Sequence, residues 1–225
     1  MGIEIELIRL GRFARLAGMD LDASWRDASY CVIDVETTGL DLKSDEIIAI
    51  GTTQIKGARI QMETNFYREV RPQRRPSIES VEIHGLRSVD LESASPIESM
   101  IPDLVKQLQG RVLIAHAKWI EKAFLERHLA GSGRNFFRGA VDTAALARAI
   151  GYASEGNDRE PSLESLARRL RLPVYAPHNA LGDALTTAVL FLAEATELER
   201  VKIAEGASLL SLKELLKISE KNSRE

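Results

Sequence analysis

Two apolar runs that favour strands lie on either side of the dipeptide Lys56-Gly57. The first run covers residues 47–55 and the second covers residues 58–62. A two-residue spacing that contains glycine is typical of a tight hairpin between antiparallel strands. Together with an earlier apolar run at residues 30–33, the pattern predicts three antiparallel strands at the front of a domain that begins near Ala28.

Strand and helix patterns alternate after the predicted hairpin. An apolar strand run at residues 112–115 lies between a helical pattern at residues 97–108 and another that ends near Leu129. Strands followed by alternating helices and strands are typical of an α/β fold. Further helical patterns cover residues 143–150, the segment that begins at Ser162, and residues 180–195.

Both ends of the chain carry amphipathic helical patterns. Apolar side chains recur at helical spacing in residues 7–17, between arginines, and again from Leu209 to Leu216. We therefore expect an N-terminal helical extension at residues 1–27, a central domain at residues 28–195 and a C-terminal helical tail at residues 196–225. The tail could dock on its own domain, which is the commonest outcome, on a second copy of the chain, or on a protein partner.

Composition limits the classes of function open to the chain. The 30 Lys and Arg residues against 33 Asp and Glu residues give a net charge of -3, so a nucleic-acid enzyme would need local basic patches or metal ions. The single cysteine, Cys31, excludes a disulfide framework and fits a reduced compartment. No stretch approaches the roughly 18 to 20 apolar residues of a membrane span, so we expect a cytoplasmic protein without membrane contact.

Acidic and histidine side chains gather in three clusters along the central domain. Asp34 and Glu36 lie two apart in the first strand, so both side chains face one side of the sheet. Glu121 lies in the helix after the fourth strand, and Asp183 follows His178 at the start of the last helix. Each cluster alone also fits a structural role, because a strand can face solvent and acids at a helix start complement its dipole.

The three clusters, in this order, resemble the motifs of the DEDDh exonuclease superfamily, typified by the proofreading epsilon subunit of bacterial DNA polymerase III. The resemblance covers about residues 28–195 and rests on Asp-x-Glu-Thr-Thr-Gly at 34–39, the second motif at 116–125, and His-x-Ala-x-x-Asp at 178–183. It implies a ribonuclease H-like α/β fold, with a mixed five-stranded sheet flanked by helices. Two positions depart from the family pattern, since Ala117 replaces the usual Asn and Glu121 the usual Asp.

Four carboxylates in one site repel, at about 4 kcal/mol for each pair about 4 Å apart in an effective dielectric near 20. Such a site needs cations, and oxygen ligands favour Mg²⁺ or Mn²⁺ over Zn²⁺. The resemblance implies two such ions, with Asp34, Glu36, Glu121 and Asp183 as ligands, which is the arrangement of two-metal phosphodiester hydrolysis.

Histidine and turn residues complete the expected site. His178, with an unperturbed pKa of about 6.5, suits the role of general base near neutral pH. For His116 a substrate contact and a core role are equally open. The resemblance also implies contacts with the terminal nucleotide from Thr37, Thr38, Gly39, Leu40 and His84.

These features predict a metal-dependent 3′–5′ exonuclease that releases nucleoside monophosphates from single-stranded ends, DNA being favoured, in DNA repair or processing. One alternative is an exonuclease of RNA or oligoribonucleotides. Another is a non-catalytic adaptor, in which Glu121 marks a decayed site and the terminal helices bind a polymerase or a second copy as a homodimer. Intact Asp34, Glu36, His178 and Asp183 weigh against decay.

Overall fold

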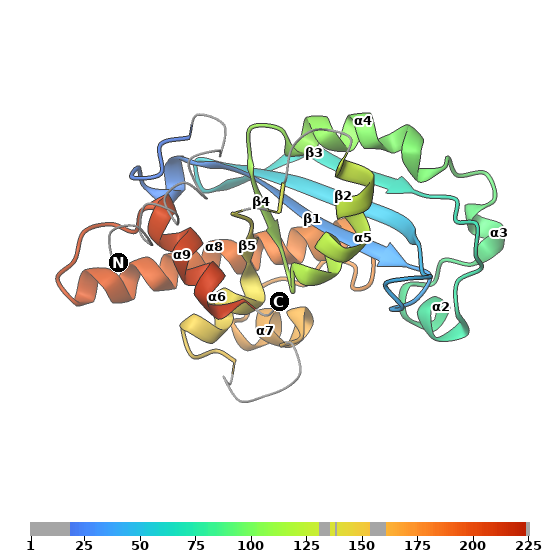
Figure 1. The fold of residues 1–225 in the computed structure, drawn as a ribbon. Helices are drawn as coiled ribbons and strands as arrows, with labels where there is room; N and C mark the ends of the chain where they lie inside the picture. The colour runs from blue at the N-terminus through green and yellow to red at the C-terminus, as the bar shows by residue number, and fades with distance from the viewer. Residues whose placement is uncertain (1–18, 131–135, 138, 154–160, 224–225) are drawn as a thin grey trace, which may run out of the picture.

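A mixed five-stranded sheet forms the centre of the molecule in the computed structural model, which describes residues 19–130, 136–137, 139–153 and 161–223 (Figure 1). The strand order is β3-β2-β1-β4-β5. The first three strands pair antiparallel, whereas β4 runs parallel to β1 and β5 parallel to β4. The predicted α/β fold with a mixed five-stranded sheet is confirmed. The bounds are β1 Ser29–Thr37, β2 Ile47–Lys56, β3 Arg59–Glu69, β4 Val112–Ala115 and β5 Val141–Asp142.

The hairpin between β2 and β3 turns at Gly57 and Ala58, whose φ angles are 57° and 53°. Positive φ at both central residues is typical of a type I′ turn, whose twist matches that of the flanking strands. The hairpin predicted from Lys56-Gly57 is therefore confirmed, with its centre one residue later. Strand β3 continues to Glu69, well beyond the predicted end at residue 62.

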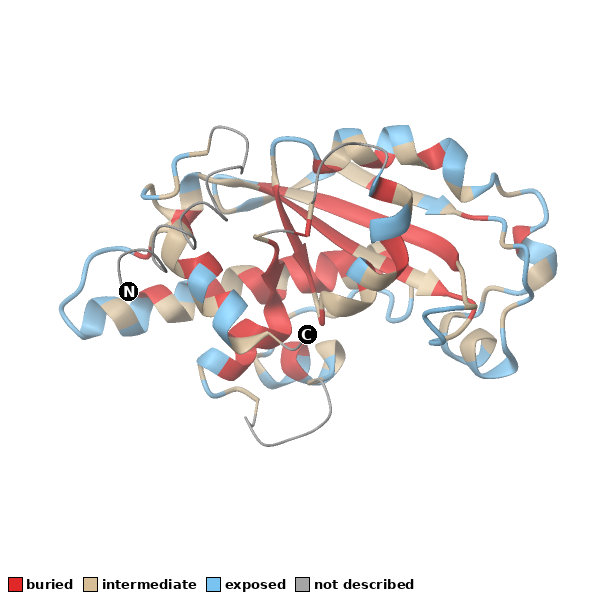
Figure 2. Ribbon diagram, in the orientation of Figure 1, coloured by how far each residue is buried: buried red, intermediate tan, exposed pale blue. Residues whose placement is uncertain are grey.

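Side chains of β1 alternate between two buried clusters, one on each face of the sheet. Tyr30 and Val32 pack in a cluster with Phe191 of helix α8 (Ala180–Ala204). Cys31 and Ile33 pack on the other face, against helices α4 (Ile97–Leu108) and α5 (Trp119–Leu129). Figure 2 shows this burial concentrated in the sheet and on the helix sides that face it. The alternation places the next two polar side chains of β1, Asp34 and Glu36, on the α8 face.

Short helices complete the chain around this framework. Helices α2 and α3 follow Pro72 and Pro76. Neither was predicted from the sequence, because α2 buries none of its side chains and α3 has only four residues. The Ser77 hydroxyl accepts a hydrogen bond from the Ser80 N–H and caps α2. The bounds are η1 Trp25–Asp27, α2 Ile78–His84, α3 Ser88–Leu91, α6 Thr143–Ala149, α7 Leu163–Arg169 and α9 Leu212–Asn222.

The C-terminal segment packs on the central sheet. Helix α8 continues past residue 195 to Ala204, and α9 buries Leu212, Leu215 and Leu216 in the cluster that contains Phe191. The Ser219 hydroxyl accepts a hydrogen bond from the Asp142 N–H at 2.9 Å. The amphipathic tail therefore docks on its own domain, the first of the three outcomes considered.

The predicted helix at residues 7–17 lies outside the described residues. Within the described ranges, none of the helices combines the length and the apolar character that crossing a bilayer requires.

Candidate active site

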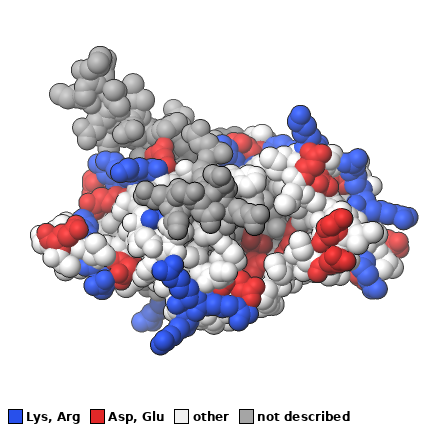
Figure 3. All heavy atoms as spheres, turned by 90° about the horizontal axis from the view of Figure 1, so that it is seen from below, with Lys and Arg blue, Asp and Glu red and all other residues white. Residues whose placement is uncertain are grey.

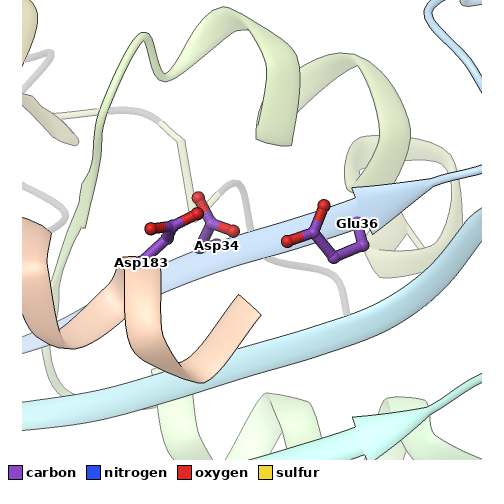
Figure 4. A group of neighbouring side chains, drawn as sticks. All are labelled: Asp34, Glu36 and Asp183. Atoms are coloured by element: carbon purple, nitrogen blue, oxygen red, sulfur yellow. The ribbon is translucent and has the colours of Figure 1, made fainter. Parts of the chain in front are cut away.

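Three carboxylates meet on the α8 face of the sheet. Asp34 and Glu36 come from β1 and Asp183 from the first turn of α8, and one oxygen from each lies within 4.8 Å of the others. Figure 4 shows the Asp34 and Asp183 side chains side by side, with Glu36 farther along the strand on the same side. All three are partly buried. The arrangement offers oxygen ligands only, which suits a hard divalent cation.

Burial and mutual repulsion raise the pKa values of these acids. Burial raises the pKa of Asp34 well above its usual range, and the charges of Glu121, Glu36 and Asp183 add to the effect. Burial and then the Asp183 charge raise the pKa of Glu36 to about 7. Burial also raises the pKa of Asp183 to about 6, although the backbone and charge of His178 act in the opposite direction. The ionised group therefore calls for a positive ligand.

Glu121 lies in the first turn of α5, with its side chain buried beside the three carboxylates. Its charge contributes to the raised pKa of Asp34, so the two carboxylates lie close enough for their charges to repel each other. Burial, followed by the charge of Asp142, raises the pKa of Glu121 itself. Its Oε2 atom is buried without a hydrogen-bond partner among the described residues. Glu121 is close to the acidic group, but it does not belong to the three residues whose oxygens meet within 4.8 Å.

His178 lies in the exposed loop that leads into α8 and adopts a positive φ of 60°. Its backbone N–H donates to Asp183 Oδ2 at 3.0 Å, and the Asn179 Oδ1 accepts from the Gly182 N–H. These bonds join the histidine loop to the first turn of the helix. Any movement of this turn therefore displaces His178 and Asp183 together.

The turn after β1 is held by internal hydrogen bonds. The Thr37 hydroxyl donates to the Gly39 carbonyl at 2.7 Å. The Thr38 N–H donates to the Glu46 carbonyl and its hydroxyl to Asp45, so these Thr38 donors are already engaged. Leu40, by contrast, lies three residues after the end of β1 and leaves 76% of its surface exposed.

Two further histidines border this region. His84 is the last residue of α2. Burial lowers the pKa of His84, the Thr37 backbone acts to raise it, and the charge of His178 lowers it further. His84 therefore lies near both Thr37 and His178. The Nδ1 of His84 accepts the Leu86 N–H. Both ring nitrogens of His116 are engaged, with Thr143 Oγ1 at 2.8 Å and the Pro161 carbonyl at 2.6 Å. His116 therefore ties β4 to α6 and to the start of α7.

Asp142 supports the second motif, residues 116–125, through a hydrogen bond to its backbone. Its buried carboxylate accepts the N–H groups of Ala117 and Ala144 at 3.1 and 3.0 Å. The first of these bonds fixes Ala117, whose φ of 56° turns the chain into α5 and sets the position of Glu121. The Val141-Asp142-Thr143 sequence contains the signal for this role, since a buried acid at a strand end needs donors.

Charge is distributed unevenly over the α7 and α8 side of the molecule. Figure 3 shows acidic side chains in a hollow near the centre of this face and Lys and Arg side chains around its edges. Among the arginines before the His84 turn, Arg68 lies over the Phe66 ring and Arg74 donates to the Ser44 carbonyl. The first contact holds Arg68 against β3, and the second holds Arg74 against the loop that leads into β2.

Comparison with known proteins places this fold and site. The family model described as exonuclease matches residues 31–191. The chain is 32% identical over 196 residues to a PolC-type DNA polymerase III of Thermotoga maritima. The matched region covers 87% of this chain but only 14% of the polymerase. The chain therefore corresponds to a small part of this relative.

Solved structures share the fold at lower sequence identity. Exonuclease X in complex with 5′ overhanging duplex DNA gives a TM-score of 0.60 at 21% identity, covering 83% of this chain and 99% of that one. The nuclease domain of 3′hExo, a DEDDh family member bound to rAMP, gives 0.62 at 15% identity, covering 84% and 98%.

The sheet order, the helices on both faces and the acidic group at the start of α8 define a ribonuclease H-like nuclease domain. The chain belongs to the exonuclease family, because the family model spans most of its length.

Proposed function

We propose that this chain is a metal-dependent 3′–5′ exonuclease that removes nucleoside monophosphates from single-stranded ends, DNA being its favoured substrate. The observation that carries this proposal is the three-carboxylate group formed by Asp34, Glu36 and Asp183. Membership of the exonuclease family supports the reaction class. A DNA preference is in keeping with the polymerase relative.

The donor set fits Mg²⁺ or Mn²⁺ as the resident cations. Carboxylate oxygens are the ligands these ions prefer, and burial together with the charges of neighbouring acids raises the pKa values of Asp34 and Glu36, which favours a bound cation. Asp34, Glu36 and Asp183 would hold the ions, and Glu121 would join them directly or through water. When bound, two divalent ions supply an activated water and stabilise the leaving 3′ oxygen.

The protein groups around the carboxylates perform the remaining tasks. His178, exposed and joined to Asp183 through its backbone, would accept the proton of the attacking water. Leu40, with its exposed side chain, would pack against the terminal base, and His84 would face the terminal sugar. The turn of Thr37, Thr38 and Gly39 would contact the terminal nucleotide. His116 would support the site indirectly, through its hydrogen bond with Thr143.

A nuclease assay on four substrates tests the proposal. Purified protein is incubated with end-labelled DNA and RNA oligonucleotides, single- and double-stranded, in Mg²⁺, Mn²⁺ or chelator. We expect stepwise shortening from the 3′ end that requires metal and is fastest on single-stranded DNA. Faster shortening of RNA would transfer the assignment to the RNA alternative, and no shortening of any substrate would favour the adaptor alternative.

Protein partners belong to the same proposal. A polymerase or a second copy of the chain remains a candidate partner, because the matched relative is a polymerase many times longer than this chain. Helix α9 is already packed on the central sheet, so such a partner would contact other surfaces.

A further inference from the structure

Gly51 lies in the middle of β2, opposite Asp34 on one neighbouring strand and opposite Tyr67 on the other. Residues directly opposite each other in antiparallel strands project to the same face of the sheet. The row Tyr67, Gly51 and Asp34 therefore crosses the face on which α8 lies, with the one residue that lacks a side chain at its centre.

The start of α8 occupies the space that a side chain at Gly51 would need. A Cβ atom built on Gly51 would come closer than 3.0 Å to the carbonyl group of Ala180 and to the nitrogen of Leu181. Real Cβ atoms essentially never show such a separation. Because these atoms are backbone atoms, no change of rotamer can relieve the contact. The helix start must move if position 51 gains a methyl group.

The helix start that rests on Gly51 carries the third carboxylate of the site. Asp183 lies in this first turn, and its N–H donates to the Asn179 carbonyl at 2.8 Å. The Asn179 side chain lies next to Tyr67, so the same turn also borders β3. Gly51 thus sets the height of this turn above the sheet, and Asp34 lies on the adjacent strand at the same level.

We propose that Gly51 is a positioning residue that sets the separation of Asp183 and His178 from Asp34 by allowing the first turn of α8 to lie directly on β2. This inference rests on the proposed function, since it assigns Gly51 to the placement of the metal ligands. The three atoms nearest to a methyl group at position 51 all belong to the helix start, so we expect the methyl group to displace this turn before the rest of the sheet.

The test measures Mn²⁺ binding to Gly51→Ala by titration calorimetry in the absence of substrate. We expect the affinity to fall about 10- to 100-fold, the usual effect of losing a group that orients metal ligands. The matched control is Ile55→Ala, four residues farther along β2 on the same face, where Ile55 packs in the cluster with Phe191. This control loses stability through a cavity but keeps the wild-type Mn²⁺ affinity.

A double variant tests the geometry directly. In Gly51→Ala/Asp183→Glu the longer acid reaches back toward Asp34 from a raised helix, so Mn²⁺ affinity should recover relative to Gly51→Ala. The single variant Asp183→Glu should bind Mn²⁺ more weakly than wild type. Additive losses in the double variant would contradict the proposal.

Hydrogen exchange of the backbone around residues 176–186 gives a readout that needs neither metal nor turnover. This segment should exchange faster in Gly51→Ala than in wild type or Ile55→Ala. If wild type binds no Mn²⁺, the proposed function fails, and the exchange data still decide the placement. Wild-type exchange and affinity in Gly51→Ala would overturn the inference. So would an alanine variant that does not fold, because Gly51 would then serve the whole sheet.

Discussion

Asp34 lies among acids that raise the pKa of its carboxyl group, after burial, in the order Glu121, Glu36 and Asp183. A carboxyl group whose pKa is raised in the folded state costs stability once the pH exceeds its unfolded value. Removing the charge at neutral pH therefore removes a cost as well as a proposed metal ligand. Stability and activity should respond to Asp34 in opposite directions.

We predict that Asp34→Asn abolishes nuclease activity and Mn²⁺ binding, while the melting temperature in chelator stays equal to that of wild type or rises. The amide keeps the shape of the side chain and removes its charge. End-labelled oligonucleotides measure the activity, titration calorimetry the Mn²⁺ binding, and scanning calorimetry the melting temperature. Asp103→Asn, at an exposed ion pair on α4, is the control and should keep full activity. Wild-type turnover by Asp34→Asn would contradict the ligand assignment.

His178 should matter for turnover and little for metal affinity, because its backbone, not its ring, is bonded to Asp183. We predict that His178→Ala lowers kcat by about 10² to 10⁴ at neutral pH, the usual contribution of a positioned acid or base. Mn²⁺ affinity should stay near the wild-type value. His128→Ala, at the far end of α5, serves as the control. An unchanged acidic limb in the pH profile of His178→Ala would show that another group is the base.

Glu121 separates a working site from a decayed one. Its buried carboxylate faces Asp34 but lies outside the group of three, so its longer arm is expected to act from a helix placed slightly farther back. We predict that Glu121→Asp, which withdraws the carboxylate by roughly 1.5 Å, lowers both initial rate and Mn²⁺ affinity, and that Glu121→Ala lowers them further. Higher activity in Glu121→Asp would indicate a decayed site, and a fully active alanine variant would remove Glu121 from the ligand set.

At the scale of the element, α8 carries a partly buried acid at the site and a fully buried acid in the core. Asp183 faces the site at its start, whereas Glu194 lies three turns later in the core, where neither carboxylate oxygen finds a hydrogen-bond partner within the described ranges. Burial, followed by the charge of Asp142, raises the pKa of Glu194 well above its usual range. The folded chain therefore holds Glu194 neutral more readily than the unfolded chain does.

This difference has a definite sign in the pH dependence of stability. The unfolded group ionises at about pH 4.3, so the cost of burying Glu194 grows as the pH rises from there toward its folded pKa. We predict that Glu194→Met raises the free energy of unfolding by about 1 to 3 kcal/mol, the cost of an unsatisfied buried group, and that the gain is larger at pH 8 than at pH 5. Urea denaturation at both pH values measures it.

Glu205→Met is the control for this prediction, because Glu205 is exposed at the end of the same helix. Its unfolding free energy should differ little from that of wild type at either pH. An identical gain for Glu194→Met at pH 5 and pH 8 would show that the folded and unfolded chains ionise Glu194 alike over that range, and would contradict the raised pKa.

For the whole molecule, sequence patterns predicted the sheet and most helices because alternation and helical periodicity are local signals. The three motifs predicted that four carboxylates, Glu121 among them, would share one site, and the structure brings together one oxygen each of Asp34, Glu36 and Asp183. The sequence did not predict α2 and α3, because α2 buries none of its side chains and so has no apolar stripe, and α3 has only four residues. It also could not place Glu121, since its distance from the group depends on how α5 packs.

Gly51 illustrates a different limit. A glycine inside an apolar strand signals a close backbone approach, but the sequence does not say by which element. Only the strand register and the position of α8 identify Ala180 and Leu181 as the residues whose backbone atoms lie against Gly51.

The raised pKa values of Glu36, about 7, and Asp183, about 6, make protons competitors of the cations in neutral solution. Loading the site with metal must then discharge hydrogen ions into the medium. The apparent heat of Mn²⁺ binding at pH 6.5 should consequently change with the ionisation enthalpy of the buffer, more strongly than at pH 8.5. A modest acidification would lower the metal occupancy of the site at constant metal concentration. The rate of the proposed reaction would then fall as the surrounding pH falls.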